Sequence, residues 1–253
     1  ATFAASTTSC HSLPHFSRLN LLWLKYYKNN LYSLINILAQ VEKKKIKHFI
    51  FSSSCTIYGE SIKLPITEEE SFKTPKSPYG YTKQIGERII KDLVFKNTEI
   101  KSISLRYFNP IGAHESILIG ENPLDKPQNL VPMITQTAIG KYPFLNIYGN
   151  DYKTRDGTCI RDYINVMDLA DAHVSALSKL IKMNSSFYDV YNVGTGKGTS
   201  VLEVIDLFEK SNNLKLNYKF SDRRNGDVES AYASCDKINK ELNWKAKYSL
   251  EDS

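Results

Sequence analysis

The sequence predicts an α/β fold with a doubly wound parallel sheet and a smaller, mixed α/β lobe. Helical and strand patterns alternate between residues 28 and 107, and residues 48–54 form a short apolar run that ends in small hydroxyl residues. Such runs are typical of parallel strands that are buried on both faces. The chain has 253 residues, 42% of them apolar, which is enough for one sizeable core with an attached lobe.

The first half of the chain is predicted to alternate helix and strand. Residues 28–42 repeat leucine and isoleucine at helical spacing, and residues 48–54 form an apolar run that ends in three serines. Pro78 favours a helix start, and that helix is expected to reach about Phe95. A second strand is expected over residues 101–107. This order predicts a parallel sheet.

After residue 110 the pattern becomes less regular, which predicts a change of architecture. Further helices are expected over residues 130–140, 166–181, 201–208 and 236–242, and further strands over residues 143–148, 188–193 and 216–220. We therefore expect residues 1–110 to form one part of the molecule and residues 111–253 the other. Some segments of the second part are expected to return to the core sheet.

Three side chains near the first predicted strand are suited to proton transfer. Ser54 ends the strand, Tyr79 lies in the first turn of the next helix, and Lys83 follows four residues later. Residues four apart share a helical face, and ligands collect at the carboxyl ends of parallel strands. A phenol is a poor base at neutral pH unless a nearby ammonium lowers its pKa. The serine hydroxyl can hold the oxygen atom that loses its proton.

The sequence motifs around these residues resemble those of the short-chain dehydrogenase/reductase family, in its extended, nucleotide-sugar branch. Within that branch they are most similar to UDP-glucose 4-epimerases. The spacing of Asn29, Ser54 and Tyr79 fits the epimerase pattern. The similar segments are Arg-Tyr-Phe-Asn-Pro-Ile-Gly-Ala-His at 106–114, Asp-Gly-Thr-Cys-Ile-Arg-Asp-Tyr-Ile at 156–164, Tyr-Asn-Val-Gly-Thr-Gly at 191–196 and Arg-Arg-Asn-Gly-Asp at 223–227.

This resemblance implies a Rossmann-like sheet that holds NAD and a lobe that binds a UDP-sugar. It also implies epimerisation of UDP-galactose to UDP-glucose at carbon 4, through a transient 4-keto sugar. Tyr79 would be the base, Lys83 would tune its pKa and hold the nicotinamide ribose, and Ser54 would bind the sugar hydroxyl. Members of the family form dimers through helices that include the one bearing the tyrosine, so a homodimer is expected.

The resemblance also assigns binding positions along the chain. Asn29 and Tyr107 match residues that contact the cofactor. The positions that match UDP-sugar contacts are Asn109, Asn129, Leu130, Arg161, Arg224 and Asp227. For Arg161, an ion pair with a local aspartate is the alternative. Ala231 matches a position that closes the sugar pocket, and its small side chain predicts room for N-acetylhexosamines. Tyr58 and Asp162 are expected to be structural.

The amino end departs from the family. No glycine precedes Gly59, so the Gly-rich turn that cradles a dinucleotide pyrophosphate is missing. Phe3-Ala4-Ala5 resembles the end of the fourth strand in epimerases, and we expect the chain to be truncated at its amino end. The alternative is an inactive remnant or binding module. A nucleotide-sugar dehydratase is disfavoured, because Cys55 and Thr56 stand where it would have an acidic pair.

Composition disfavours other classes of partner. The net charge is +6, but the one dense basic cluster, residues 43–47, lies where a helix is expected to end, and lysines there interact favourably with the helix dipole. We therefore expect no nucleic-acid partner, and no apolar run is long enough to span a membrane. The four cysteines are scattered without metal-ligand spacing, which favours a reducing, cytoplasmic location.

Overall fold

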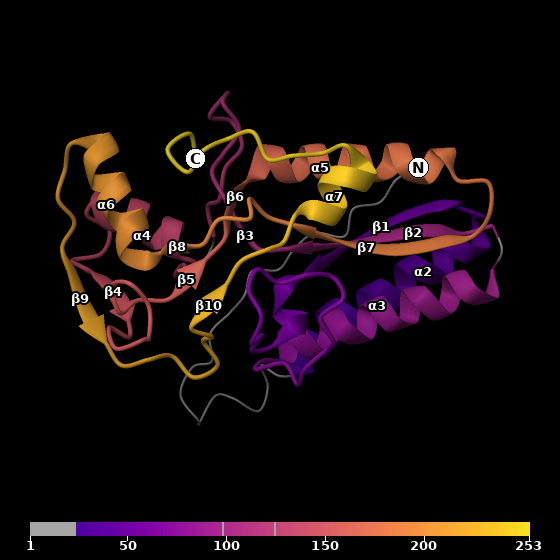
Figure 1. Ribbon diagram of the computed structural model, residues 1–253, viewed down its shortest axis with the longest axis horizontal. Coiled ribbons are helices and arrows are strands. Elements are labelled where there is room, and N and C mark those ends of the chain that lie inside the picture. Colours follow the sequence, from indigo (N-terminus) through magenta and orange to yellow (C-terminus); the bar gives the residue numbers. More distant parts are fainter. Residues whose placement is uncertain (1–23, 98, 124) are drawn as a thin grey trace.

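The computed structural model describes residues 24–97, 99–123 and 125–253 (Figure 1). The Phe3-Ala4-Ala5 segment and Cys10 lie outside the described residues. The helix expected over residues 28–42 is confirmed. Helical residues 24–27 precede a wider π-helical turn, η1 (Lys28–Tyr32), which continues as α2 (Ser33–Lys43). The basic cluster follows its end, with Lys43 in the last turn.

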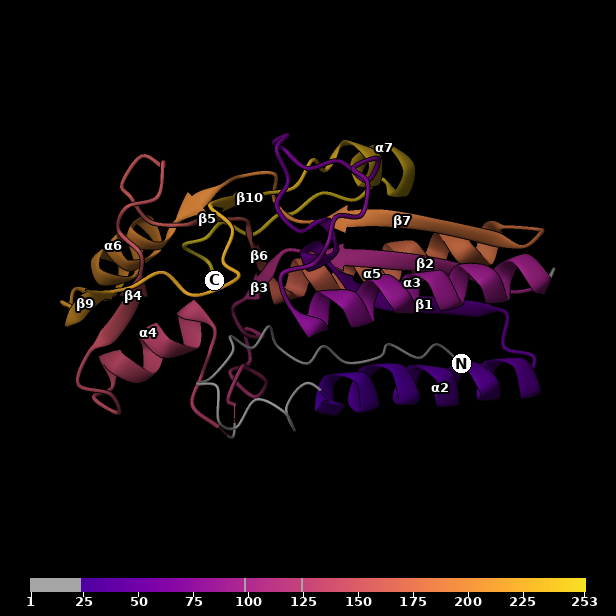
Figure 2. The same cartoon turned by 90° about the horizontal axis from the view of Figure 1, so that it is seen from below.

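The main sheet has three parallel strands in the order β1, β2, β7. They are β1 (His48–Ser54), β2 (Lys101–Tyr107) and β7 (Phe187–Val193). Helices α2 and α3 (Pro78–Lys96) cover one face, and α5 (Val166–Lys182) with α7 (Asp236–Leu242) covers the other (Figures 1 and 2). The predicted parallel, doubly wound arrangement is confirmed.

Each face of the sheet has its own apolar core. The core beneath α2 and α3 contains Leu34, Leu38, Val41, Phe49, Phe51, Ile90, Val94 and Ile100. The core beneath α5 and α7 includes Ile50, Ile103, Leu105, Tyr107, Ala172, Leu180, Tyr191 and Trp244. On β1, Phe49 and Phe51 enter one core and Ile50 enters the other, as the two-residue period of a strand requires. Strand β2 contributes Ile103, Leu105 and Tyr107 to the core beneath α5 and α7.

Helix α3 begins as its sequence predicts and packs very close to β1. Ser77 caps it by accepting a hydrogen bond from the Gly80 amide at 3.2 Å, and Pro78 occupies the first turn. At Gly86, an added Cβ atom would lie only 2.7 Å from Phe51 Cζ. Glycine at this position allows the helix that carries Tyr79 and Lys83 to approach the strand that carries Ser54.

The second part of the molecule is built on two parallel strands, β4 (Leu145–Tyr148) and β9 (Tyr218–Ser221). Helices α4 (Leu130–Ala138) and α6 (Val201–Asn212) pack beside them (Figure 1). A capping box begins α6, because the side chains of Ser200 and Glu203 each accept a hydrogen bond from the backbone amide of the other residue. Gly194, Gly196 and Gly198 therefore belong to the turn before a helix, as expected, rather than to a phosphate-binding loop.

All the predicted helices and strands in the described residues exist, and the ends of several are shifted. Helix α6 continues to Asn212, beyond the expected residue 208, and β9 begins at Tyr218. The sequence did not predict the short elements η2 (Cys55–Tyr58), β3 (Asn109–Ile111), β5 (Ile160–Arg161), β6 (Tyr163–Asn165), β8 (Thr199–Ser200) and β10 (Ser230–Ala231). Elements of two to four residues are too short to show a periodic pattern.

Two further observations limit what the described residues can do. No helix among them combines the length and the apolar character that crossing a lipid bilayer requires. Nor do residues 24–97, 99–123 and 125–253 bring together three or more His, Cys, Asp or Glu side chains that could hold a metal ion. The cysteines in this part of the chain, Cys55, Cys159 and Cys235, are free thiols.

Candidate active site

Tyr79 and Lys83 lie side by side on the face of α3 that meets β1. Their exposed fractions are 5% and 6%. The Lys83 ammonium is 5.3 Å from the centre of the Tyr79 ring, and it donates a hydrogen bond to the Ser52 carbonyl at 2.7 Å. A buried cation close to a phenol stabilises the phenolate electrostatically. This pair therefore has the arrangement that a tyrosine base requires.

Ser54 is the last residue of β1 and is nearly buried, with an exposed fraction of 7%. Its hydroxyl oxygen accepts hydrogen bonds from the Thr56 amide at 3.3 Å and the Thr56 hydroxyl at 3.0 Å. In both contacts Ser54 is the acceptor, so neither uses its own hydroxyl proton. The serine therefore keeps a proton that it can donate at the carboxyl end of the strand.

Tyr107, a candidate for cofactor contact, points toward α5 rather than toward α3. It belongs to the core beneath α5, and its hydroxyl lies 2.8 Å from Ser52 Oγ and 2.6 Å from His173 Nε2. Burial raises the pKa of Tyr107, while the Ser52 hydrogen bond opposes the shift. The structure therefore does not bring this phenol to Tyr79. The next residue, Phe108, is buried in the cluster that contains Ala231.

Asn29, the other candidate for cofactor contact, is exposed in η1. Its neighbour Asn30 is the residue that reaches α3, where its side-chain amide donates to the Thr82 hydroxyl at 2.8 Å. Thr82 immediately precedes Lys83. The sequence contains two consecutive asparagines, so the pattern alone could not indicate which of them meets the helix.

Three of the candidate UDP-sugar ligands come together in the fold. Arg161 and Arg224 both pair with the carboxylate of Asp227, at 3.7 Å and 3.0 Å respectively. The Arg224 guanidinium also lies 4.7 Å from the centre of the Tyr148 ring. Arg161 thus has an aspartate partner, but that aspartate is 66 residues along the chain rather than local, and it is itself a candidate ligand. Two guanidinium groups this close form a site suited to a diphosphate.

Ala231 lies next to this cluster. It pairs with Arg161 in the register between β10 and β5, and its exposed fraction is 8%. It packs with Phe108 and with Cys55, which directly follows Ser54. The small Ala231 side chain therefore lies between the arginine cluster and the end of β1.

The remaining candidates lie where the main sheet leads into the second lobe. Asn109 begins β3, and its backbone amide donates to the Asp162 carbonyl at 2.9 Å. Asn129 precedes α4, and its side chain donates to Glu121 at 2.9 Å. Leu130 opens α4 and packs against the core of the lobe. Asn129 and Leu130 are consecutive, and within the described residues no hydrogen bond joins either of them to Asn109.

Asp162 has the structural role expected for it. It is fully buried, and its carboxylate accepts hydrogen bonds from the Thr195 amide and hydroxyl, the Gly196 amide and the Ala233 amide, at 2.7 to 3.1 Å. It therefore holds the turn after β7 and the segment after β10 against β5. Gly194 is required beside it, since an added Cβ atom would lie 2.4 Å from Asp162 Oδ2.

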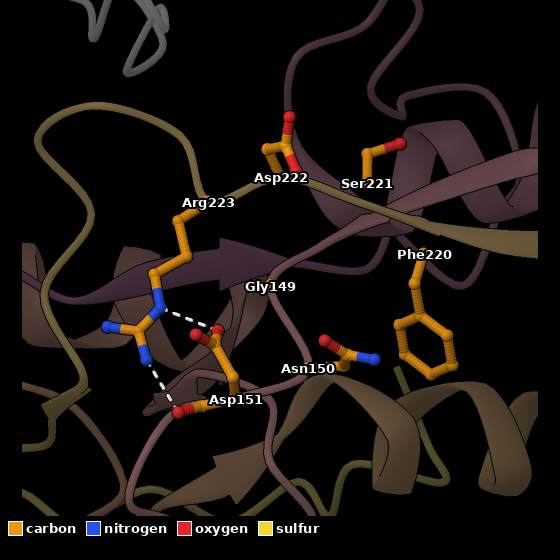
Figure 3. A pocket seen from close by; sticks show the side chains of 7 residues that line it. All are labelled: Gly149, Asn150, Asp151, Phe220, Ser221, Asp222 and Arg223. Atoms are coloured by element: carbon orange, nitrogen blue, oxygen red, sulfur yellow. Dashed lines mark hydrogen bonds and ion pairs between the residues drawn. The ribbon is translucent and has the colours of Figure 1, made fainter.

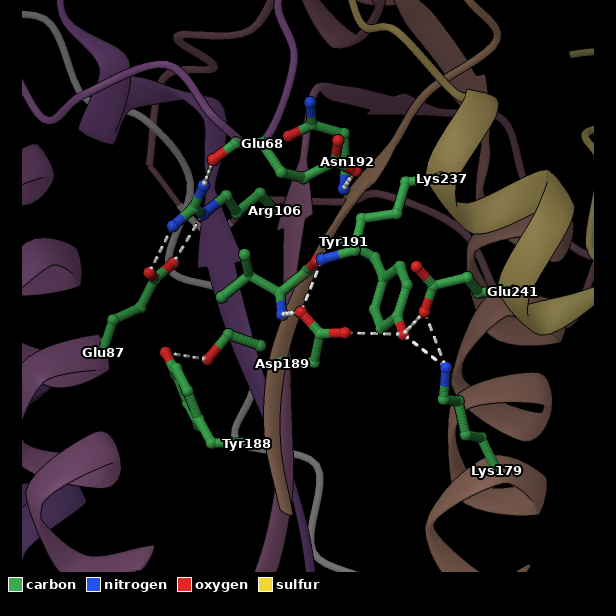
Figure 4. Close-up of polar contacts among 12 residues, drawn as sticks. Glu68, Glu87, Arg106, Lys179, Tyr188, Asp189, Tyr191, Asn192, Lys237 and Glu241 are labelled. Atoms are coloured by element: carbon green, nitrogen blue, oxygen red, sulfur yellow. Dashed lines mark hydrogen bonds and ion pairs between the residues drawn. The ribbon is translucent and has the colours of Figure 1, made fainter. Parts of the chain in front are cut away.

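Sequence reasoning missed a buried polar network between α3 and β2, whose ion pair is drawn in Figure 4. Glu87 of α3 and Arg106 of β2 form an ion pair at 2.7 Å, with exposed side-chain fractions of 3% and 5%. Arg106 also donates to the Tyr58 hydroxyl at 2.8 Å. Burial by itself would lower the pKa of Arg106, but its contacts with Glu87 raise it overall. The charged partners are 19 residues apart, and no local pattern reveals such a pairing.

A surface hollow of about 310 Å³ lies elsewhere, at the ends of β4 and β9 (Figure 3). Its lining residues are Gly149, Asn150, Asp151, Phe220, Ser221, Asp222 and Arg223. Arg223 closes one side by donating to the Asp151 carboxylate at 2.7 Å. None of Ser54, Tyr79 or Lys83 lines this hollow, so it is separate from the proton-transfer residues.

Known proteins resemble this chain over most of its length. Residues 24–253 match the profile of the GDP-mannose 4,6 dehydratase family. UDP-glucose 4-epimerase 2 of Arabidopsis thaliana is 46% identical over 253 residues, covering 98% of this chain and 72% of that protein. The chain belongs to the UDP-glucose 4-epimerase family. UDP-glucose 4-epimerase GEPI42 of Cyamopsis tetragonoloba is 48% identical over 227 residues, which are 90% of this chain and 64% of that protein. The chain thus spans about two thirds of the length of these relatives.

Solved structures of epimerases share the fold. The UDP-glucose 4-epimerase of Stenotrophomonas maltophila, crystallised with NAD and formylated UDP-arabinopyranose, is 38% identical with a TM-score of 0.88. The Bifidobacterium longum enzyme, crystallised with NAD+ and UDP, is 42% identical with a TM-score of 0.87. In each case the match covers 96% of this chain and 71% of the other. The expected Rossmann-like α/β class is therefore confirmed.

Proposed function

We propose that this chain carries the catalytic and sugar-binding residues of an NAD-dependent UDP-glucose 4-epimerase, which interconverts UDP-galactose and UDP-glucose. The observation that carries the proposal is the buried Lys83 ammonium 5.3 Å from the Tyr79 ring, beside the end of the strand that bears Ser54. Family membership supports the reaction type. In this proposal residues 1–110 serve the cofactor and residues 111–253 serve the sugar.

The roles of the residues follow from their chemistry. Tyr79, as phenolate, takes the proton from the sugar 4-hydroxyl and later returns it. Lys83 keeps that phenolate stable, and Ser54 donates a hydrogen bond to the sugar oxygen. Arg161 and Arg224 exchange their contacts with Asp227 for hydrogen bonds to the diphosphate oxygens. Asp227 then accepts a hydrogen bond from a ribose hydroxyl. Asn109, Asn129 and Leu130 contact the rest of the UDP-sugar.

The described residues fit one end of NAD. Tyr79 and Lys83 suit the nicotinamide ribose, because a phenol and a buried ammonium meet there at the carboxyl end of β1. Asn29 and Tyr107 are the further cofactor positions carried over from the resemblance. When bound, NAD accepts a hydride from carbon 4 and gives it back. The first described strand leads into η2 rather than into a glycine-rich turn, so no pyrophosphate cradle lies within the described ranges.

Titration with NAD tests this proposal. We would measure binding to this 253-residue chain and to the encoded protein at its full length, and then assay both for UDP-galactose conversion. The proposal expects the full-length protein to bind NAD and to epimerise. Failure of both proteins to bind or to convert the sugar would favour the alternative, an inactive remnant or binding module. Binding without turnover would favour the binding module specifically.

We also propose a homodimer and a cytoplasmic location. Four large apolar side chains are exposed by 38 to 62%: Tyr32 at the end of η1, Ile35 on α2, and Tyr81 and Ile85 on α3. Exposed apolar surface of this kind is typical of a subunit interface. Sedimentation of the full-length protein tests the dimer. The free thiols support a reducing compartment, which microscopy of a tagged protein tests.

A further inference from the structure

We propose that the buried ion pair of Glu87 and Arg106 positions the active site, by fixing how α3 is seated on β1. Helix α3 carries Tyr79 and Lys83, and β1 carries Ser54. The inference rests on the function proposed above, since it concerns the geometry of that site. Neither Glu87 nor Arg106 touches the reacting atoms, so both are positioning residues.

The first argument is that α3 is attached to β1 at two successive helical turns. Lys83 donates to the Ser52 carbonyl at 2.7 Å, and Glu87, one turn later, accepts from the Ser53 hydroxyl at 2.5 Å. Residues four apart lie on the same helical face, so both contacts act on the same side of α3. Ser52, which accepts the first hydrogen bond, and Ser53, which donates the second, directly precede Ser54 on β1. Sliding α3 along β1 would break both contacts.

The second argument is that Arg106 connects Glu87 to the chain on the other side of Ser54. Its Nε and one terminal nitrogen hold the two Glu87 oxygens at 3.0 Å and 2.7 Å. Its other terminal nitrogen donates to the hydroxyl of Tyr58, which closes η2. The Tyr58 hydroxyl in turn donates to Asn192 of β7 at 2.6 Å. The Arg106 guanidinium of β2 therefore binds α3 and η2 directly, and it is linked to β7 through Tyr58. Figure 4 shows its contact with Glu87.

The third argument concerns energy. A buried ion pair adds little net stability compared with an apolar pair of the same volume. Its bidentate geometry, however, restricts distance and angle much more than apolar contact does. A shift of about 1 Å in a catalytic group costs on the order of a hundredfold in rate. The network is therefore best placed to act on the Ser54–Tyr79 distance rather than on folding alone.

The test compares two matched substitutions in the full-length protein, Ser53→Ala and Ser104→Ala, each of which removes one hydroxyl group. Both serines are fully buried on adjacent strands, and each loses one hydrogen bond, to Glu87 or to the Tyr188 hydroxyl respectively. We would measure kcat per molecule of bound NAD, so that unfolded molecules are not counted, together with KM for UDP-galactose. Ser53→Ala should lower kcat about tenfold with KM unchanged, and Ser104→Ala by less than about twofold.

A second variant, Glu87→Asp, keeps the negative charge but is one methylene shorter, so its carboxylate moves away from both Ser53 and Arg106. It should lower kcat at least as much as Ser53→Ala does. Equal kcat values for Ser53→Ala and Ser104→Ala would overturn the inference, as would a loss seen only in KM. An unsubstituted protein that does not epimerise would overturn the proposed function and this inference together. Because the unsubstituted protein is assayed first, the two failures are distinguishable.

Discussion

Lys83 Nζ lies 5.3 Å from the centre of the Tyr79 ring, one helical turn along α3, and both side chains are almost completely buried. A cation held this close, with little water, stabilises a phenolate more than an exposed lysine would. The arrangement explains why a tyrosine could serve as a base at this position.

Removing the phenolic oxygen tests that role directly. We expect Tyr79→Phe in the full-length protein to lower epimerisation of UDP-galactose by about a hundredfold to ten-thousandfold, because a positioned general base contributes on that order. Thermal unfolding should change little, since the ring remains in place. Tyr81→Phe is the matched control, because Tyr81 is 38% exposed on the same helix. Removal of its hydroxyl should leave activity within about twofold. Undiminished turnover in Tyr79→Phe would contradict the proposed mechanism.

The size of the Ala231 side chain should set substrate breadth. Ala231 is buried beside Phe108, so a tyrosine there would fill the space that an N-acetyl group needs. We expect Ala231→Tyr to lower conversion of UDP-N-acetylgalactosamine by at least about tenfold relative to UDP-galactose. The control is Tyr232→Phe at the neighbouring position. An unsubstituted protein that converts only the plain hexoses would refute the predicted breadth.

Asp162 should matter for stability. Its carboxylate accepts four hydrogen bonds in a fully buried position, so Asp162→Ala leaves several buried donors without partners. We expect the free energy of unfolding to fall by about 3 kcal/mol or more, measured by denaturant titration. Asp171→Ala is the control, because Asp171 forms an exposed pair with Lys247 and should cost less than about 1 kcal/mol. Equal losses in the two variants would argue against the role of Asp162.

His173 should give the protein a pH-dependent component of stability. Burial lowers the pKa of His173 below its usual 6.5, while the hydrogen bond to the Leu169 carbonyl opposes the shift. The unfolded chain therefore takes up the proton first as the pH falls. The resulting stability is complete above about pH 6.5 and is lost as the pH decreases through the lower folded pKa.

We expect His173→Gln to flatten the decrease in unfolding free energy between about pH 7 and 5. Chemical denaturation at several pH values measures this. The unsubstituted protein, measured at the same pH values, is the control. A slope in His173→Gln as steep as in the unsubstituted protein would show that the histidine does not contribute.

The sequence by itself determined the parts of this protein that depend on local spacing. The helix and strand order follows from apolar periodicity, and Tyr79 and Lys83 share a face because they are four residues apart. Ser54 could be located because an apolar run ends there. The short elements such as β5 and β10 could not be predicted, because strands of two residues form only when a distant partner pairs with them.

Only the tertiary structure decided which distant side chains meet. Arg161 and Asp227 are 66 positions apart, and Glu87 and Arg106 come from a helix and a strand. In the fold, the Tyr107 hydroxyl contacts His173, and the side chain of Asn30, rather than that of Asn29, contacts α3. These outcomes depend on sheet register and on how closely α3 packs against β1. Such packing is a property of many contacts at once, so no single motif in the chain could specify it.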